Sequence, residues 1–108
     1  MAKAPDETKG NPAGDLVVEE RTRLKKPRKY KVILHNDDYT AMDFVVLVLV
    51  KFFRKTQTEA TQIMLEVHHR GSGVCGVFTY EVAEAKVMQV SDFAQANGYP
   101  LRCTMEPE

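Results

Sequence analysis

A short polar turn between two apolar segments constrains this chain more than any other feature. The apolar residues 32–34 are soon followed by the polar residues 36–38, and Asn and Asp favour turns because their side chains bond the nearby backbone. Thr40 and Asp43 then have the spacing of a capping box, which marks the start of a helix. We therefore predict a strand, an acidic turn and a helix, a layout that is typical of a small binding site. A solvated turn without any binding role is the alternative.

Length and charge limit the class of protein. A chain of 108 residues has room for one modest domain. Residues 1–29 carry eight Lys or Arg against five Asp or Glu, whereas residues 30–108 carry seven against ten. The chain has no apolar run near the ~20 residues that span a bilayer and no secretory signal. We expect a cytoplasmic protein without membrane contact, in which Cys75 and Cys103 act as small buried hydrophobic residues.

The first 29 residues have the composition of a flexible tail. They contain Pro and Gly, many charges and no sustained apolar period. The basic residues 21–31 could form a nucleic-acid-binding arm, but acidic neighbours and the lack of an aromatic residue before Tyr30 favour a solvated linker. We therefore predict a tail at 1–29, one domain at 30–108 and no nucleic-acid partner.

The segment at residues 42–55 is the hardest to assign. Its β-branched part, residues 44–50, would suit a buried strand. Its length, the preceding Thr40 and the basic residues near its end favour a helix instead. Because the segment is apolar nearly all round, we predict that it forms the central, most buried helix.

The other elements follow more regular patterns. Residues 30–36 alternate as a strand does, and Thr56 with Glu59 predicts a second capped helix that stops at Gly71. Gly76 lies inside the next strand and indicates either a bulge or a close backbone approach. Further elements are predicted at 74–79 (strand), 80–97 (helix) and 101–106 (strand). The resulting β-α-α-β-α-β order predicts an α+β sandwich, in which three helices cover a three-stranded antiparallel sheet.

Catalytic chemistry has little support in the sequence. Asp37, Asp38, His68 and His69 lack the spacing of a metal site, and adjacent histidines on a helix should point to different sides. Cys75 has no neighbour that would activate its thiol. Both aspartates look solvated and ionised, which suits a general acid poorly. We predict no enzyme, metal or cofactor. A small hydrolase that is metal-dependent or uses acid-base chemistry through Asp37, Asp38 and His68 is the alternative.

A binding site has better support. If the second helix packs beside the first strand, His68 approaches Asn36 and Asp37. A neutral imidazole, an amide oxygen and a carboxylate then offer acceptors and negative charge, which suits a primary ammonium group. An adjacent apolar pocket could be walled by Met42, Val45, Met64 and Val67. The alternative is that His68 only stabilises the C-terminal end of its own helix.

Four segments resemble one known family. The strings YKVILHNDDYTAMDFV, ATQIMLEVHHRG, VCGVFTYEVAEAK and PLRCTMEPE are similar to ClpS, the bacterial N-end-rule adaptor, and occur in the expected order from Tyr30 to the C-terminus. The resemblance implies the same α+β fold. It also implies a protein that binds substrates beginning with Leu, Phe, Tyr or Trp and delivers them to a Clp-family AAA+ unfoldase.

The resemblance assigns roles to individual residues. Asn36 and His68 would bind the substrate α-amino group directly, with charge from Asp37, and Met42 would act as a gate against β-branched residues. The pocket for the first side chain would consist of Leu34, Asp38, Thr40, Met42, Val45, Met64, Val67 and Leu101. Docking on the N-domain of the unfoldase would involve Tyr39, Glu81 and Lys86. The protein is expected to be a monomer, and its tail to engage the unfoldase during hand-over.

Two positions depart from the family pattern. Ala41 stands where the family usually has a proline, which would pre-set the backbone at the first turn of the helix. His35 stands where the family is often apolar. Both lie beside the predicted site, so we expect them to affect which first residues are accepted.

Overall fold

The computed structural model describes residues 27–108, so the predicted tail lies almost entirely outside the described residues. The elements are β1 (Lys29–His35), α2 (Met42–Phe53), α3 (Gln57–Arg70), β2 (Ser72–Thr79), α4 (Tyr80–Ala96) and β3 (Arg102–Pro107). Their order confirms the predicted β-α-α-β-α-β arrangement. The segment that could have been a strand or a helix is the helix α2.

The three strands form one antiparallel sheet with the order β2-β1-β3. Val32 pairs with Gly76, but the next residue, Ile33, pairs with Val74. Cys75 is therefore an extra residue on β2, which confirms the predicted bulge at this point. The bulge lies at a buried position, since Cys75 is 1% exposed.

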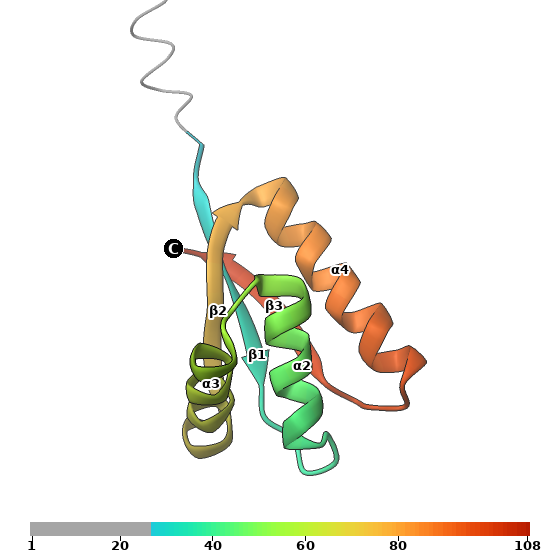
Figure 1. Ribbon diagram of the computed structural model, residues 1–108. Helices are drawn as coiled ribbons and strands as arrows, with labels where there is room; N and C mark the ends of the chain where they lie inside the picture. The colour runs from blue at the N-terminus through green and yellow to red at the C-terminus, as the bar shows by residue number, and fades with distance from the viewer. Residues whose placement is uncertain (1–26) are drawn as a thin grey trace, which may run out of the picture.

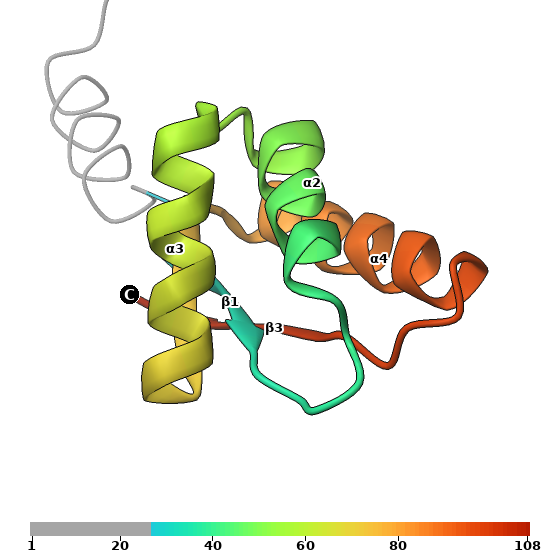
Figure 2. The same ribbon diagram turned by 60° about the horizontal axis from the view of Figure 1, so that its bottom comes forward.

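All three helices lie on one face of this sheet, and α2 lies between α3 and α4 (Figures 1 and 2). Val32 and Leu34 of β1 are completely buried under them. Helix α2 contributes more buried side chains than α3 or α4, as predicted: Phe44, Val45, Val46, Val48, Leu49 and Phe53. Within residues 27–108, no helix is both long enough and apolar enough to cross a bilayer.

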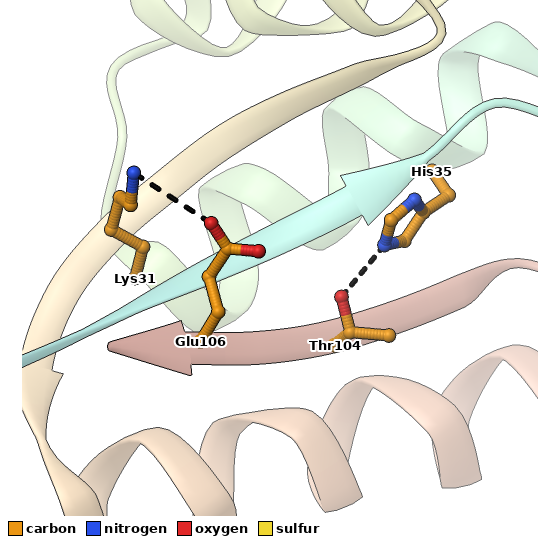
Figure 3. A network of polar contacts seen from close by, with 4 residues as sticks. All are labelled: Lys31, His35, Thr104 and Glu106. Atoms are coloured by element: carbon orange, nitrogen blue, oxygen red, sulfur yellow. Dashed lines mark hydrogen bonds and ion pairs between the residues drawn. The ribbon is translucent and has the colours of Figure 1, made fainter. Parts of the chain in front are cut away.

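The opposite face of the sheet carries polar links between β1 and β3 (Figure 3). Lys31 and Glu106 form an ion pair at 3.8 Å, and His35 Nε2 lies 2.7 Å from the Thr104 hydroxyl oxygen. These residues alternate with the buried ones along each strand. The outward face is therefore polar where β1 meets β3, and His35 is attached to β3 at the point where β1 ends.

The ends of α2 and α3 show how local chemistry sets the helix limits. Thr56 and Glu59 form the predicted capping box, with both reciprocal hydrogen bonds present. Gly71 ends α3 with a φ of 93°, a conformation that glycine adopts without strain. Helix α2 ends two residues earlier than predicted, because Arg54 takes a left-handed conformation with a φ of 54°.

Candidate binding site

The turn that follows β1 is organised by the carboxylate of Asp37. Its Oδ1 accepts hydrogen bonds from the backbone N–H groups of Tyr39 and Thr40, each at 2.8 Å. Its Oδ2 accepts a third from the Thr40 hydroxyl at 2.7 Å. Asp37 thus holds residues 37–40 in one conformation.

The predicted helix cap at Thr40 is wrong. The residue that precedes α2 is Ala41, and no side chain caps the helix there. Thr40 lies one residue before this position, and its hydroxyl donates to Asp37. Thr40 therefore stabilises the acidic turn rather than the helix.

The same hydrogen bonds fix the charge of Asp37. Partial burial raises the pKa of Asp37, but the hydrogen bonds from Thr40 and Tyr39 lower it by more, and the pKa lies below its ordinary value. Asp37 is consequently ionised at neutral pH. It provides a fixed negative charge and cannot serve as a proton donor there.

Asn36 and His68 come together because the turn is attached to the end of α3. The backbone N–H of Asn36 donates to the carbonyl oxygen of Gly71 at 2.9 Å, and His68 lies in the last turn of α3. Both side chains line the same cavity. In the part of the chain that the structure describes, neither the Asn36 amide nor the His68 ring has a hydrogen-bond partner, so both are available to a ligand.

This cavity has a volume of about 180 Å³ and lies between α2, α3 and the acidic turn. A cavity of about 150 Å³ is known to hold a benzene ring, so the space suits one aromatic or branched side chain. Its polar lining comes from His35, Asn36, Asp37, Asp38, Thr40 and His68, and its apolar lining from Met42, Val45, Met64, Val67 and Leu101. Met42 is 44% exposed, whereas Val45 and Val67 are buried, which places Met42 at the opening.

Most residues of the sequence-predicted set meet at this cavity, but Leu34 does not line it. Leu34 is completely buried in the core beneath the helices, because strand alternation gives it the same orientation as Val32. His35 lines the cavity and was not part of the predicted pocket. Its departure from the family pattern was the one signal that could have revealed it.

The histidines of α3 lie closer together than expected for neighbours on a helix. The ring centroids of His68 and His69 are 5.1 Å apart in an edge-to-face arrangement. Only His68 lines the cavity, since His69 borders a separate depression beside Leu65. The two rings are thus neighbours with different surroundings.

The three residues expected to dock on the unfoldase do not all lie on the same element of the domain. Tyr39 is 81% exposed and follows the end of β1 at which His35 pairs with Ser72. Glu81 lies at the opposite end of the sheet, next to the pairing of Lys29 with Thr79. Figure 1 shows the two ends on opposite sides of the domain.

Lys86 is the third of these residues, and its ammonium group already has partners. Its Nζ donates to the carbonyl oxygen of Phe52 at 2.7 Å, which supplies a bond to the C-terminal end of α2. The same nitrogen lies 6.0 Å from the centroid of the Phe78 ring. Lys86 thus connects α4 to α2.

Neither a reactive thiol nor a cluster of metal ligands is found among the described residues. Burial raises the pKa of both thiols, that of Cys103 to about 12, so neither cysteine is a nucleophile at neutral pH. Within residues 27–108, no group of three or more His, Cys, Asp or Glu side chains is placed to hold a metal ion. The metal-dependent form of the hydrolase alternative therefore has no support within residues 27–108.

Comparison with known proteins now gives the family. Residues 25–104 match the family described as ATP-dependent Clp protease adaptor protein ClpS. The chain belongs to the ClpS family. ClpS adaptors from Rhodospirillum centenum and Bdellovibrio bacteriovorus are 55% and 59% identical to it. The first match covers 100% of both chains, and the second covers 91% of this chain and 86% of the relative.

A solved ClpS structure has the same fold. Agrobacterium tumefaciens ClpS2 bound to L-phenylalaninamide superposes with a TM-score of 0.75 at 40% sequence identity, over 77% of this chain and 100% of the other. ClpS is a family of protease adaptors and not of enzymes. The prediction of a non-catalytic adaptor fold is therefore confirmed at the level of the family.

Proposed function

We propose that this ClpS protein binds the free N-terminal residue of a protein substrate in the cavity between α2 and α3, and delivers that substrate to a Clp AAA+ unfoldase. The observation that carries the proposal is the cavity itself, which joins an acidic, acceptor-rich opening to an apolar interior. The related ClpS2 was solved with L-phenylalaninamide, a compound with a free α-amino group and a benzyl side chain. First residues of the same kind, Leu, Phe, Tyr and Trp, are the proposed ligands.

The α-amino group has three partners in this proposal. The amide oxygen of Asn36 and an unprotonated ring nitrogen of His68 accept its hydrogen bonds, and Asp37 supplies the negative charge, in part through water. Ammonium groups carry three donors and no acceptor, which matches this set. The low pKa of Asp37 supports its part, since the charge is present at all pH values at which an adaptor would work.

The first side chain occupies the apolar part of the cavity. Val45, Val67 and Leu101 are buried and form its interior, while Met42 and Met64 are more exposed. Met42 is the proposed gate, because a β-branched side chain would meet it where the chain enters. Leu34, which is completely buried and does not line the cavity, is no longer part of the proposed pocket.

Docking on the N-domain of the unfoldase is proposed for the end of the domain that carries Glu81. Glu81 is exposed, and Lys86 lies on the same helix. Tyr39, at the other end of the sheet, is proposed to make a separate contact with the same N-domain. The remaining proposals, which come from the sequence, are hand-over by the tail at 1–29, a monomer and a cytoplasmic location.

One binding assay tests the central proposal. Peptides beginning with Leu, Phe, Tyr, Trp, Val or Met are compared with the same peptides carrying an acetylated N-terminus. Acetylation removes the charge and two of the three N–H donors, so Asn36 and His68 cannot both be paired. Because hydrogen bonds to charged groups contribute roughly 1.5–3 kcal/mol each, we expect at least about a tenfold loss of affinity. Equal affinity for free and acetylated peptides would refute the proposal.

A further inference from the structure

Helix α3 packs on β2 at a residue without a side chain, Gly73. Gly73 is buried and pairs with Leu34 on the face of the sheet that the helices cover. A Cβ atom placed there would lie 2.9 Å from Cγ2 of Val67 and 3.6 Å from the carbonyl oxygen of Ile63. Figures 1 and 2 both show α3 alongside β2. Helix α3 can therefore pack this closely on β2 only because residue 73 has no side chain.

The same valine forms part of the wall of the binding cavity. Val67 is 3% exposed and lines the cavity with Met64 and His68, which lie on the same helix. One methyl group of Val67 therefore contacts Gly73, while the side chain also borders the space for the ligand. Ile63, the other neighbour of Gly73, does not line the cavity.

We propose that Gly73 is a positioning residue that sets the width of the cavity through Val67, and thereby the size of first residue that the protein accepts. The inference rests on the proposed binding of N-terminal residues. Protein interiors are close-packed and yield little, so a displaced Val67 methyl moves toward the nearest free space. That space is the cavity of about 180 Å³.

The effect of a side chain at position 73 depends on the size of the ligand. In Gly73→Ala, Val67 has to move by about 0.5 Å to restore an ordinary contact of 3.4 Å or more. A ligand that fills the cavity meets the displaced wall, whereas a smaller one does not. A methylene-sized change in an apolar pocket alters selectivity by roughly tenfold or more. We expect Gly73→Ala to lower the affinity for a Trp peptide about tenfold relative to a Leu peptide.

Matched variants separate this effect from a general loss of stability. Gly76→Ala places the same methyl group on the same strand, where it meets the Phe78 ring at 2.7 Å, and Phe78 does not line the cavity. Gly76→Ala should leave the ratio of Trp to Leu affinity unchanged. Val67→Ala should raise that ratio, and adding Gly73→Ala to Val67→Ala should leave it at the value of Val67→Ala, because the methyl group that a side chain at 73 would displace is gone.

The measurement is the affinity of each folded variant for free Trp and Leu peptides, with circular dichroism as the folding check. A Trp-to-Leu ratio that Gly73→Ala leaves unchanged, or an equal loss for both peptides, would overturn the inference. If the single variant does not fold, the double variant decides, because a ratio clearly below that of Val67→Ala alone would show that a side chain at 73 acts without Val67, and would also overturn the inference. Failure of the unmodified protein to bind either peptide would instead refute the proposed function.

Discussion

The backbone N–H of Asn36 donates a hydrogen bond to the carbonyl oxygen of Gly71 at 2.9 Å. This bond attaches the acidic turn to the C-terminal end of α3, and so to His68. The two proposed ligands of the α-amino group are held by separate elements that meet only through the tertiary fold. Their approach is therefore a property of the packing of α3 on the sheet, and not of either segment alone.

The first prediction concerns pH and His68. A protonated imidazole offers only donors and would repel an ammonium group, so the proposed contact needs the neutral ring. We expect peptide affinity to fall severalfold between pH 7.5 and 5.5. Asp37 does not cause this step, because its lowered pKa keeps it ionised throughout this range. Fluorescence anisotropy across the pH range measures the effect.

The neighbouring histidines provide the controls for this experiment. His68→Ala should bind poorly and lose the pH step. His69→Ala removes a ring only 5.1 Å away that does not line the cavity, and should keep both affinity and step. His35→Gln removes the other imidazole of the lining and should keep the step. Full affinity in His68→Ala would show that His68 only ends its helix.

The second prediction concerns the hydrogen bond from Thr40 to Asp37. Thr40→Val removes the hydroxyl at nearly constant volume, so the pKa of Asp37 should rise toward its ordinary value and the free energy of unfolding should fall by up to about 1 kcal/mol at pH 7. Thr40→Ser keeps the hydroxyl and should lie close to the unmodified protein. Urea unfolding of the three proteins measures the difference.

The pH dependence of this difference in stability tests whether it depends on the charge of Asp37. The pKa of Asp37 is lower in the folded state, so its contribution to stability is complete above the pKa of the unfolded chain and is lost as the pH falls through the folded value. The gap between Thr40→Val and the unmodified protein should therefore shrink in acid. A gap that is constant from pH 7 to pH 3 would mean that the hydroxyl stabilises the turn without the charge.

The wrong prediction of a helix cap at Thr40 shows a limit of sequence patterns. The spacing of Thr40 and Asp43 is the same as that of Thr56 and Glu59, but only the second pair forms a capping box. What differs is the start of the helix: the N-cap of α3 is Thr56, whereas the N-cap of α2 is Ala41, so Thr40 lies one residue too early. The spacing rule does not reveal that Thr40 belongs to the acidic turn, whereas the three hydrogen bonds to Asp37 do.

The fold itself was predictable because its signals are local. Strand alternation, an apolar helix and the stop at Gly71 each follow from neighbours in sequence. Contacts between distant residues were not predictable in this way. The bond from Lys86 to Phe52 joins residues 34 positions apart, and Leu34 was assigned to the pocket by resemblance although alternation directs it into the core. Whether such residues touch each other or line the cavity depends on distances between the packed layers, which the sequence does not give.

The third prediction concerns the gate at Met42. Met42→Ala should admit peptides that begin with Val or Ile, because it removes the wall that a branched Cβ would meet. The gain corresponds to about 1–3 kcal/mol, as for a methylene-sized difference in a pocket. Met64→Trp should instead fill the cavity and abolish binding while the protein stays folded. Competition binding with Leu, Val and Ile peptides measures both, and an unchanged order of preference in Met42→Ala would contradict the gate.

The fourth prediction separates recognition from delivery. The described residues that line the cavity all lie between His35 and Leu101, so a protein truncated to start at Pro27 should bind Leu and Phe peptides with unchanged affinity. Its thermal unfolding should also be nearly unchanged, since the buried core of residues 27–108 begins at Val32. If the removed residues engage the unfoldase, as the family resemblance implies, the truncated protein should nevertheless fail to support degradation of a substrate with an N-terminal Leu.

Reconstituted degradation with the unfoldase, its protease and ATP tests this outcome, with peptide affinity measured on the same preparations. A matched control replaces residues 1–26 by a Gly/Ser segment of equal length, which keeps the span of the tail and removes its sequence. Restored degradation with this segment would mean that length alone is needed, because a flexible chain of that size already spans roughly 25–30 Å. Degradation that is undiminished by the truncation would instead show that the folded domain, with Glu81 exposed at one end and the cavity at the other, is sufficient for delivery.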